Sequence, residues 1–311
     1  MTWKEPKMGI EPEKLVGEHE FYCCGAKVLV KDGEVKVLTE PRIVHCPLHG
    51  TLYGTKTVDR EAVKRSVSMK IAGHGFCCEH RSFDGSLVVP YGSSELISVC
   101  MKKGLLDCAV TVCDGAGTVI TSNPELVQAI GARLTGIIRT SPIKSTIEYI
   151  KANRGIVLDE ASAQIDQAEG AARAAELGYR HIAVTVASYN SEYIQKIRRI
   201  GKERGIEVAV FSVCNTCASE ADVERILAGA DVACASASKL VREKIGPKAL
   251  MQLGVTIPVF ALTKLGKNLL LAYLAEFDES IVAFRTKKMP YLVEGKGPQL
   301  REQSKTHKNI C

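Results

Sequence analysis

The stretch that decides the fold class runs from residue 177 to residue 213: LGYRHIAVTVASYNSEYIQKIRRIGKERGIEVAVFSV. Two runs rich in Val, Ile and Ala, His181–Ala187 and Glu207–Val213, have the length of buried strands, and apolar residues recur at helical spacing over Tyr193–Arg204 between them. Gly205 then supplies a signal that ends the helix. A strand, an amphipathic helix and a second strand in this order predict two parallel strands joined by a crossover helix.

The same alternation continues through most of the chain. We expect strands at residues 87–89, 108–113, 136–140, 155–158, 181–187, 207–213, 231–237 and 257–263. Strands that alternate with helices favour an α/β fold with a mainly parallel, doubly wound, Rossmann-like sheet covered on both faces. The predicted division is a small β-rich, Cys/His-containing N-terminal segment (1–85), an α/β domain (86–285) and a polar basic tail (286–311).

The N-terminal segment has a different pattern. Apolar and polar residues alternate with period two over residues 26–31, and Asp32-Gly33 is typical of a type I′ turn. Residues 35–38 are expected to form the second strand, so the segment is predicted to be a hairpin. Residues 59–68 are compatible with a short helix, and the glycines of 73–80 favour a loop.

Composition limits the classes of protein to which the chain can belong. With 311 residues, 46% hydrophobic and 24% charged, it is expected to be globular rather than disordered. The net charge of +6 comes without a basic stripe interleaved with aromatic residues, so no nucleic-acid partner is predicted. No signal peptide and no membrane-spanning run are recognised, which predicts a cytoplasmic protein without a membrane partner. In a reducing cytosol, the twelve cysteines are expected to be thiols, metal ligands or redox pairs.

Hydroxylated and Gly-rich loops follow several predicted strands. The carboxyl ends of parallel strands and the helix N-termini beside them form the usual ligand site of such sheets, and they favour a phosphate or carboxylate. The candidate residues for binding an anionic small molecule are Ser93, Ser94, Asp114, Gly115, Gly117, Thr118 and Lys239. Ordinary helix capping explains many of these residue types equally well. The turn Asp114-Gly-Ala-Gly-Thr118 resembles only a fragment of the dinucleotide fingerprint, and a tight hairpin turn is an equal alternative.

Cys214-x-x-Cys217 lies between a predicted strand and a predicted helix. One interpretation is dithiol redox chemistry, because a helix N-terminus lowers the pKa of a thiol. The other is metal ligation together with Cys234, as an iron–sulfur cluster or zinc site. Cys234 is also compatible with a plain core position.

Residues 19–80 hold five of the seven histidines and five of the twelve cysteines. Such crowding favours a metal or thiol site, although buried reduced cysteine is an ordinary small core residue. The candidate metal ligands of the whole chain are Cys46, Cys77, Cys78, Cys214, Cys217 and Cys234. No spacing here matches a standard zinc finger or ferredoxin motif.

A family resemblance covers residues 23–274. Its most specific part is LLDCAVTVCDGAGTVITSNPELVQAIGARLTGIIRTSPI (105–143), with VHCPL (44–48) upstream and HIAVTVA (181–187) and ASASKLVREKIGPKALMQLGVTIPVFALTKLGKNLLL (235–271) downstream. The chain resembles the methanogenesis marker protein 8 family, whose members occur in methane-producing archaea.

The resemblance implies a connection to methanogenesis. Maturation of methyl-coenzyme M reductase or of its cofactors is the process implied, with the proteins of that maturation as partners. Cys46, the turn at 114–118 and a cysteine close to position 234 belong to the family pattern. The pairs Cys23-Cys24, Cys77-Cys78 and Cys214-x-x-Cys217 depart from it.

Three hypotheses follow for the function. The first is an accessory protein of methanogenesis that carries an iron–sulfur or other metal centre. The second is an enzyme that acts on an anionic or phosphorylated small molecule at the strand ends. A separate alternative is a thiol redox protein that uses Cys214 and Cys217. The third is a scaffold whose cysteines are simply buried. The sequence leaves open whether the protein is an enzyme.

Overall fold

The stretch around His181 folds as its sequence pattern predicts. In the computed structural model, which describes residues 17–31, 33–86, 91–132 and 136–301, β9 (His181–Ala187) leads into α7 (Tyr193–Arg204). Gly205 ends this helix in the left-handed conformation (φ 62°), and β10 (Glu207–Val213) then pairs parallel to β9. The crossover unit predicted from the sequence is therefore confirmed.

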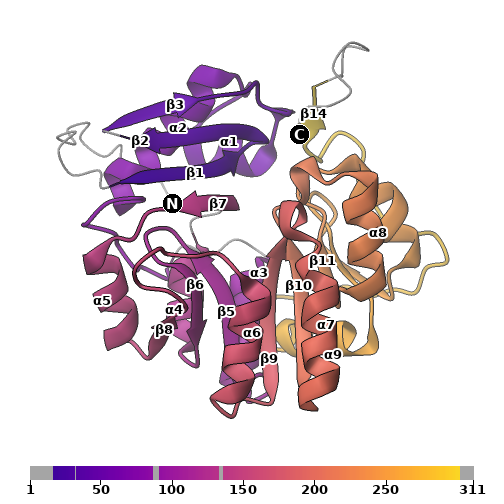
Figure 1. The fold of residues 1–311 in the computed structure, drawn as a ribbon. Helices are drawn as coiled ribbons and strands as arrows, with labels where there is room; N and C mark the ends of the chain where they lie inside the picture. Colours follow the sequence, from indigo (N-terminus) through magenta and orange to yellow (C-terminus); the bar gives the residue numbers. More distant parts are fainter. Residues whose placement is uncertain (1–16, 32, 87–90, 133–135, 302–311) are drawn as a thin grey trace.

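This unit lies at the centre of an eight-stranded sheet with the order β12-β13-β11-β10-β9-β5-β6-β8 (Figure 1). The other strands of this sheet are β5 (Cys108–Cys113), β6 (Gly117–Thr121), β8 (Gly155–Val157), β11 (Val232–Cys234), β12 (Met251–Leu253) and β13 (Val259–Ala261). The four central strands β5, β9, β10 and β11 are parallel, whereas β6 is antiparallel to β5 and β13 is antiparallel to β11. The fold is thus α/β with a mixed sheet, and the mainly parallel Rossmann-like arrangement holds only for the centre.

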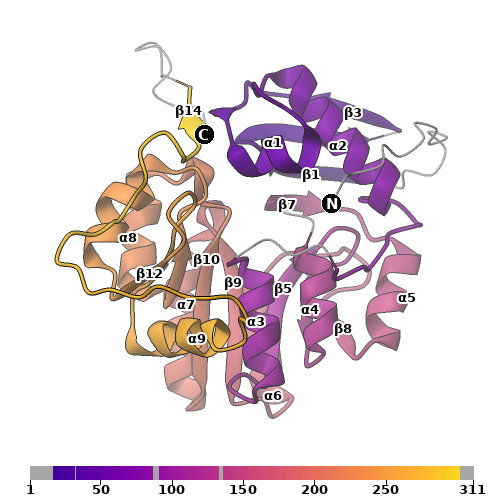
Figure 2. The same cartoon turned by 180° about the vertical axis from the view of Figure 1, so that it is seen from behind.

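Helices cover both faces of the large sheet, as the doubly wound prediction requires. Figure 1 shows α6 and α7 on one face, and Figure 2 shows α3 and α9 on the other. Alternate residues of β5 point to the two sides: Val110 packs in the core beneath α6 and α7, and Ala109 packs in the core beneath α3 and α9. Besides α7, the helices of this domain are α3 (Ser93–Lys102), α4 (Pro124–Gly131), α5 (Lys144–Ala152), α6 (Gln167–Glu176), α8 (Glu220–Gly229) and α9 (Lys264–Leu274).

A second, four-stranded antiparallel sheet lies above the carboxyl ends of the central strands (Figure 1). Its order is β3-β2-β1-β7, from β3 (Glu34–Val37), β2 (Ala26–Lys31), β1 (Glu18–Cys23) and β7 (Gly136–Thr140). The predicted hairpin is confirmed as β2 and β3, although Asp32 of its turn lies outside the described residues. One apolar face of this small sheet packs on α2 (Arg60–His74).

Two predicted elements differ in the structure: one strand pairs with a distant partner, and one helix extends further than expected. Residues 136–140 form a strand of the small sheet, antiparallel to β1, rather than a strand of the large sheet. The helix expected at 59–68 begins where predicted, since the Asp59 side chain caps it by accepting a hydrogen bond from the amide of Ala62. It is longer than expected, because it continues through His74 into the segment predicted to be a loop and ends only at Gly75. The strand expected at 87–89 lies outside the described residues.

The C-terminal segment returns to the N-terminal unit. Its strand β14 (Gln299–Leu300) pairs with β4 (Ile43–His45), which precedes the short helix α1 (Pro47–Tyr53). Part of the segment predicted as a polar basic tail therefore pairs with the N-terminal unit, through Gln299 and Leu300. Within the described ranges, no helix combines the length and the apolar character that a membrane crossing requires.

Candidate functional site

A cavity of about 870 Å³ separates the small sheet from the carboxyl ends of the large sheet. Its walls come from both units: the β1–β2 turn and α1 on one side, and the ends of β9, β10 and β11 with the N-terminus of α3 on the other. This volume lies within the range of small-molecule and cofactor sites, about 300–1,000 Å³. The cavity also occupies the place where parallel sheets bind ligands, beyond the carboxyl ends of their strands.

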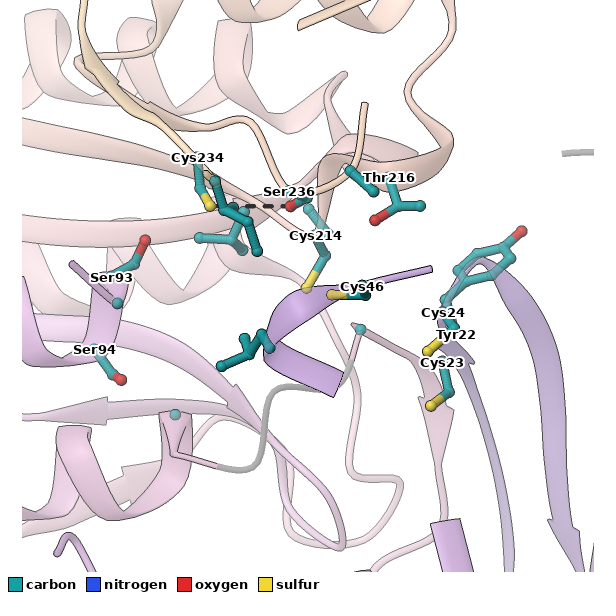
Figure 3. A pocket seen from close by; sticks show the side chains of 18 of the residues that line it. Tyr22, Cys23, Cys24, Cys46, Ser93, Ser94, Cys214, Thr216, Cys234 and Ser236 are labelled. Atoms are coloured by element: carbon teal, nitrogen blue, oxygen red, sulfur yellow. Dashed lines mark hydrogen bonds between the residues drawn. The ribbon is translucent and has the colours of Figure 1, made fainter. Parts of the chain in front are cut away.

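Cysteine thiols are the distinctive lining groups of this cavity. Figure 3 shows several of them projecting from opposite sides. The small unit contributes Cys23, Cys24 and Cys46, and the large domain contributes Cys214, Cys217 and Cys234. The two cysteine-rich regions of the sequence, about 170 residues apart, are therefore brought to one site by the tertiary fold.

Cys23 and Cys24 lie beside a buried lysine. Lys70 of α2 is 4% exposed, and its ammonium group lies 5.9 Å from the centre of the Tyr53 ring. A hydrogen bond with Cys24 holds the pKa of the Cys23 thiol below its ordinary value, and the positive charge of Lys70 acts in the same direction. Burial by itself would lower the pKa of Lys70, but Tyr53 and the two thiols outweigh burial and raise this pKa above its usual value.

His49 presents unused hydrogen-bonding capacity to the cavity. Its side chain lines the cavity and is 6% exposed, and neither ring nitrogen has a hydrogen-bond partner among the residues that the structure describes. Burial, together with the charges of Lys70 and Arg65, lowers its pKa to about 4, so the imidazole is neutral at physiological pH. A buried polar group without a partner costs free energy, which favours a ligand that completes its hydrogen bonds or coordinates a nitrogen.

The opposite wall is built around a strained turn. Cys214 (φ 52°) and Ser236 (φ 50°) both have left-handed backbone conformations that are uncommon for residues other than glycine. Asn215 holds the two loops together, because its backbone N–H donates to Ser236 Oγ (3.1 Å) and its side-chain amide donates to the carbonyl of Cys234 (2.8 Å). Such strain is concentrated at functional sites in proteins, and here it directs thiols into the cavity.

The premise behind the dithiol redox interpretation of Cys214 and Cys217 is not met. These residues belong to a three-residue 3-10 turn, Asn215–Cys217, and the following helix α8 begins only at Glu220, with Ser219 as its cap. Burial raises the pKa of Cys214 to about 12. A helix N-terminus therefore does not activate this thiol.

The residues predicted to bind an anion separate into two groups. Ser93, Ser94 and Asp114 line the cavity. Gly115 instead lies in the β5–β6 hairpin turn, as the alternative interpretation proposed, and Gly117 begins β6 directly after it. A Cβ at Gly117 would lie 2.1 Å from the carbonyl oxygen of Ala163. These two glycines permit close packing of the protein on itself.

Thr118 and Lys239 also lie away from the cavity lining. The Thr118 hydroxyl is buried and accepts a hydrogen bond from the backbone N–H of Asp166 (2.9 Å). Lys239 is exposed and pairs with Glu243 at 3.6 Å. Asp114, although it lines the cavity, is 2% exposed and pairs with the buried Arg81 at 2.7 Å.

The predicted metal ligands separate in the same way. Cys46, Cys214, Cys217 and Cys234 line the cavity, whereas Cys77 and Cys78 are packed in the core behind it. Thiolates and imidazoles are donors for iron–sulfur clusters and zinc, so the chemistry of the lining fits such groups. In the described part of the chain, however, no three His, Cys, Asp or Glu side chains are close enough together to hold one metal ion. The donor set therefore fits a group that spans the cavity better than it fits a single ion.

Sequence reasoning missed Lys70, Tyr53 and Tyr189 as lining residues. A signal existed for Lys70, because it falls on the apolar stripe of α2 together with Val63 and Val67, where a surface lysine is not expected. Nothing comparable marked the two tyrosines, whose positions depend on the packing of the two units.

The fold and the cavity define a mixed α/β protein with a thiol-lined site between a small antiparallel sheet and a larger sheet. The chain belongs to an archaeal family: residues 19–275 match the family described as "Uncharacterized protein conserved in archaea (DUF2099)". A relative, the "Uncharacterized protein MJ0054" of Methanocaldococcus jannaschii, is 39% identical over 259 residues, which cover 83% of this chain and 90% of the relative. The matched range contains all the cavity-lining residues except Pro298.

Proposed function

We propose that this protein is an accessory protein of methanogenesis that binds a thiophilic metal group in the cavity. The observation that carries the proposal is the convergence of six cysteines from distant parts of the chain on one cavity of cofactor size. An iron–sulfur cluster is the first candidate and zinc the alternative, because both are bound through thiolates. Cys46, Cys214, Cys217 and Cys234 are the ligands proposed for it.

The surrounding residues would serve such a group in defined ways. The cysteines would bind it from both sides of the cavity, and the Ser236 hydroxyl, 4.0 Å from Cys234 Sγ, would orient that thiol. Neutral His49 would add a nitrogen donor or a hydrogen bond. The apolar walls would limit access of water. When bound, the group would supply electron transfer or the donation of metal and sulfide.

The process served is proposed from the family resemblance. Assembly or activation of methyl-coenzyme M reductase, or of one of its cofactors, is the proposed task, with proteins of that maturation as partners. Deleting the gene in a methane-producing archaeon is expected to leave the reductase polypeptide present but inactive. Full reductase activity in the deletion strain would contradict this assignment without affecting the cavity chemistry.

Metal content tests the binding proposal directly. Iron, zinc and acid-labile sulfide would be measured per chain on anaerobically purified protein, on the variant Cys214→Ser/Cys217→Ser and on Cys46→Ser. We expect iron with matching sulfide, or zinc alone, in the wild type and its loss in the variants. Cys100→Ser is the matched control, because Cys100 is buried between α3 and α9, away from the cavity, and should leave the metal in place.

The proposal would be overturned if no preparation contained metal, including protein reconstituted with iron and sulfide. Metal that persists in both cavity variants would equally contradict the proposed ligands.

A second candidate function rests on the N-terminus of α3. Ser93 and Ser94 line the cavity at the start of this ten-residue helix, whose cap is Gly92 and which has no side-chain capping hydrogen bond. Unpaired backbone N–H groups at such a position favour an anion. The candidate is an enzyme that acts on an anionic or phosphorylated small molecule. Thermal stabilisation by phosphorylated metabolites, reduced in Ser93→Pro but not in the distant Ser162→Ala, is the expected result.

A further inference from the structure

Gln167 is a polar residue on the sheet-facing side of α6. The positions that share this face, Gly170, Ala171 and Ala174, are small and buried. The helix lies so close to the large sheet that a Cβ at Gly170 would come within 2.7 Å of a methyl carbon of Val110 in β5. Gln167 therefore continues the buried face of α6 at its first turn, where the helical pattern favours an apolar residue.

This position places the side chain of Gln167 at the cavity. Gln167 is 2% exposed, and it belongs to the cavity lining. Its amide oxygen has no hydrogen-bond partner among the residues that the structure describes. A buried acceptor of this kind costs free energy unless a ligand or an ordered water completes it. The cavity is the place from which such a partner can reach it.

His49 supplies a second group of this kind from the small unit. Its ring packs against Tyr53, with 4.8 Å between the ring centres, and neither ring nitrogen has a partner in the described part of the chain. A neutral imidazole has one N–H donor and one acceptor nitrogen. Gln167 and His49 thus offer uncharged donors and acceptors to the same cavity from the two units that enclose it.

The charged side chains of the described cavity lining already interact with protein groups. Asp114 pairs with Arg81 at 2.7 Å, and Glu95 accepts a hydrogen bond from the Tyr273 hydroxyl at 2.7 Å. Lys70 lies over an aromatic ring of α1. A charged ligand placed against Gln167 and His49 would lose its hydration without gaining a counter-charge from either residue, which is costly. The two residues therefore favour an uncharged ligand.

Aromatic and aliphatic side chains form much of the remaining wall. The rings of Tyr22 and Tyr189 lie 5.4 Å apart, and both residues line the cavity. Flat aromatic surfaces of this kind pack well against a ring system. Apolar walls with a few fixed polar groups are the usual composition of small-molecule sites.

We propose that the cavity binds an uncharged aromatic heterocycle with a cyclic amide edge, in which a ring N–H stands beside a carbonyl, and that Gln167 recognises this edge. The side-chain amide of glutamine carries an acceptor oxygen next to an N–H donor, so it can pair with a cyclic amide through two hydrogen bonds. His49 donates its ring N–H to a second carbonyl of the ligand. The proposal goes beyond the metal and anion candidates, because Gln167 takes part in neither.

The test uses quinazoline-2,4-dione as the probe, on the full-length protein as purified anaerobically. This ring system is uncharged and has a cyclic amide edge and a second carbonyl. Its 1,3-dimethyl derivative keeps the ring and both carbonyls but has no N–H. Isothermal titration calorimetry should show binding of the first compound and about tenfold weaker binding of the second, because the Gln167 oxygen then stays without a donor.

Variants assign the preference to its residue. Gln167→Leu, which keeps a similar volume, should weaken binding of quinazoline-2,4-dione by about tenfold and abolish its advantage over the dimethyl compound. His49→Leu should weaken both compounds alike, because both keep the carbonyl that His49 contacts. Gln195→Leu is the control, because Gln195 is exposed on α7 and its loss should leave both affinities unchanged.

Three results would overturn the proposal. The wild type could bind neither compound, which would mean that water completes the two residues, or it could bind both equally well. A folded Gln167→Leu protein could keep the full preference for the N–H compound. Tighter binding of quinoline-2-carboxylate, an anion of similar size, would instead support the anion candidate. Metal content of the same preparations is measured separately, so metal binding and ring binding can fail independently.

Discussion

Two buried polar clusters on the N-terminal side of the molecule differ in how completely their hydrogen bonds are satisfied. In the first, Arg81 Nε donates to Asp114 Oδ1 at 2.7 Å, and the backbone N–H of Cys77 donates to Asp114 Oδ2 at 2.8 Å. In the second, neither ring nitrogen of His49 has a hydrogen-bond partner within the described part of the chain. Both clusters border the cavity, but only the second presents unused hydrogen-bonding groups to it.

The difference separates structure from candidate function. A fully paired charge rigidifies its surroundings but has no capacity left for a ligand. The Arg81 guanidinium also lies 4.3 Å from the centre of the Phe83 ring, and the side chains of Arg81 and Asp114 are both almost completely buried. Asp114 was a candidate ligand residue in the sequence, and the geometry favours a structural role for it.

The largest effect is expected from breaking the ion pair. Asp114→Ala should lower the free energy of unfolding by about 3–5 kcal/mol, because it leaves the buried Arg81 charge without its partner. Urea unfolding of the wild type and the variant measures this change. Glu148→Gln is the control, because its pair with Lys144 is exposed at 3.8 Å, and a loss below about 1 kcal/mol is expected there. A similarly small loss for Asp114→Ala would show that the two clusters do not differ as described.

A pH dependence of stability is expected from His49. The folded protein keeps this imidazole neutral down to a pKa of about 4, whereas the unfolded chain takes up a proton near the ordinary value of 6.5. The stability that follows is fully present above pH 6.5 and is lost as the pH falls toward 4, by about 3 kcal/mol in total.

The variant His49→Leu isolates this effect. Compared with the variant, the wild type should lose about 3 kcal/mol more between pH 6.5 and pH 4, as measured by chemical unfolding at each pH. The exposed His80→Gln should have the pH profile of the wild type. Parallel profiles for the wild type and His49→Leu would mean that His49 is accessible to solvent or already partnered.

The smallest effect is expected at the boundary between the two sheets. Tyr189 follows β9 and donates a hydrogen bond from its hydroxyl to the carbonyl of Ile137 in β7 at 2.9 Å. Tyr189→Phe should lower the free energy of unfolding by about 1 kcal/mol, the usual net value of one hydrogen bond. Tyr149→Phe, on the exposed face of α5, should change it by less than about 0.5 kcal/mol. Equal effects would argue that this bond does not join the sheets.

The centre of the large sheet could be predicted because its information is local. The run His181–Ala187, the helix Tyr193–Arg204 and Gly205 each carry their own pattern, and a right-handed crossover is nearly obligatory for such a unit. The edges could not be predicted in this way. Gly136–Thr140 reads as one more buried strand, yet it pairs with β1, which lies more than a hundred residues earlier.

The candidate site was predicted only in its residue types. Crowded cysteines indicated a thiol or metal site, and Cys46, Cys214, Cys217 and Cys234 do line the cavity. Adjacent cysteines at 77 and 78 looked equivalent to the pair at 23 and 24 in the sequence. They differ because one pair follows a helix into the core and the other stands at a hairpin tip.

The sequence by itself determined the α/β class, the parallel central strands and the wealth of thiols, since these follow from local hydrophobic periodicity and composition. Only the tertiary structure decided which thiols meet, which polar groups remain without partners and which strands close the edges of the sheet. These outcomes depend on contacts between segments far apart in the chain. No local pattern encodes such contacts, because the free energy that selects them arises only when the two sheets pack together.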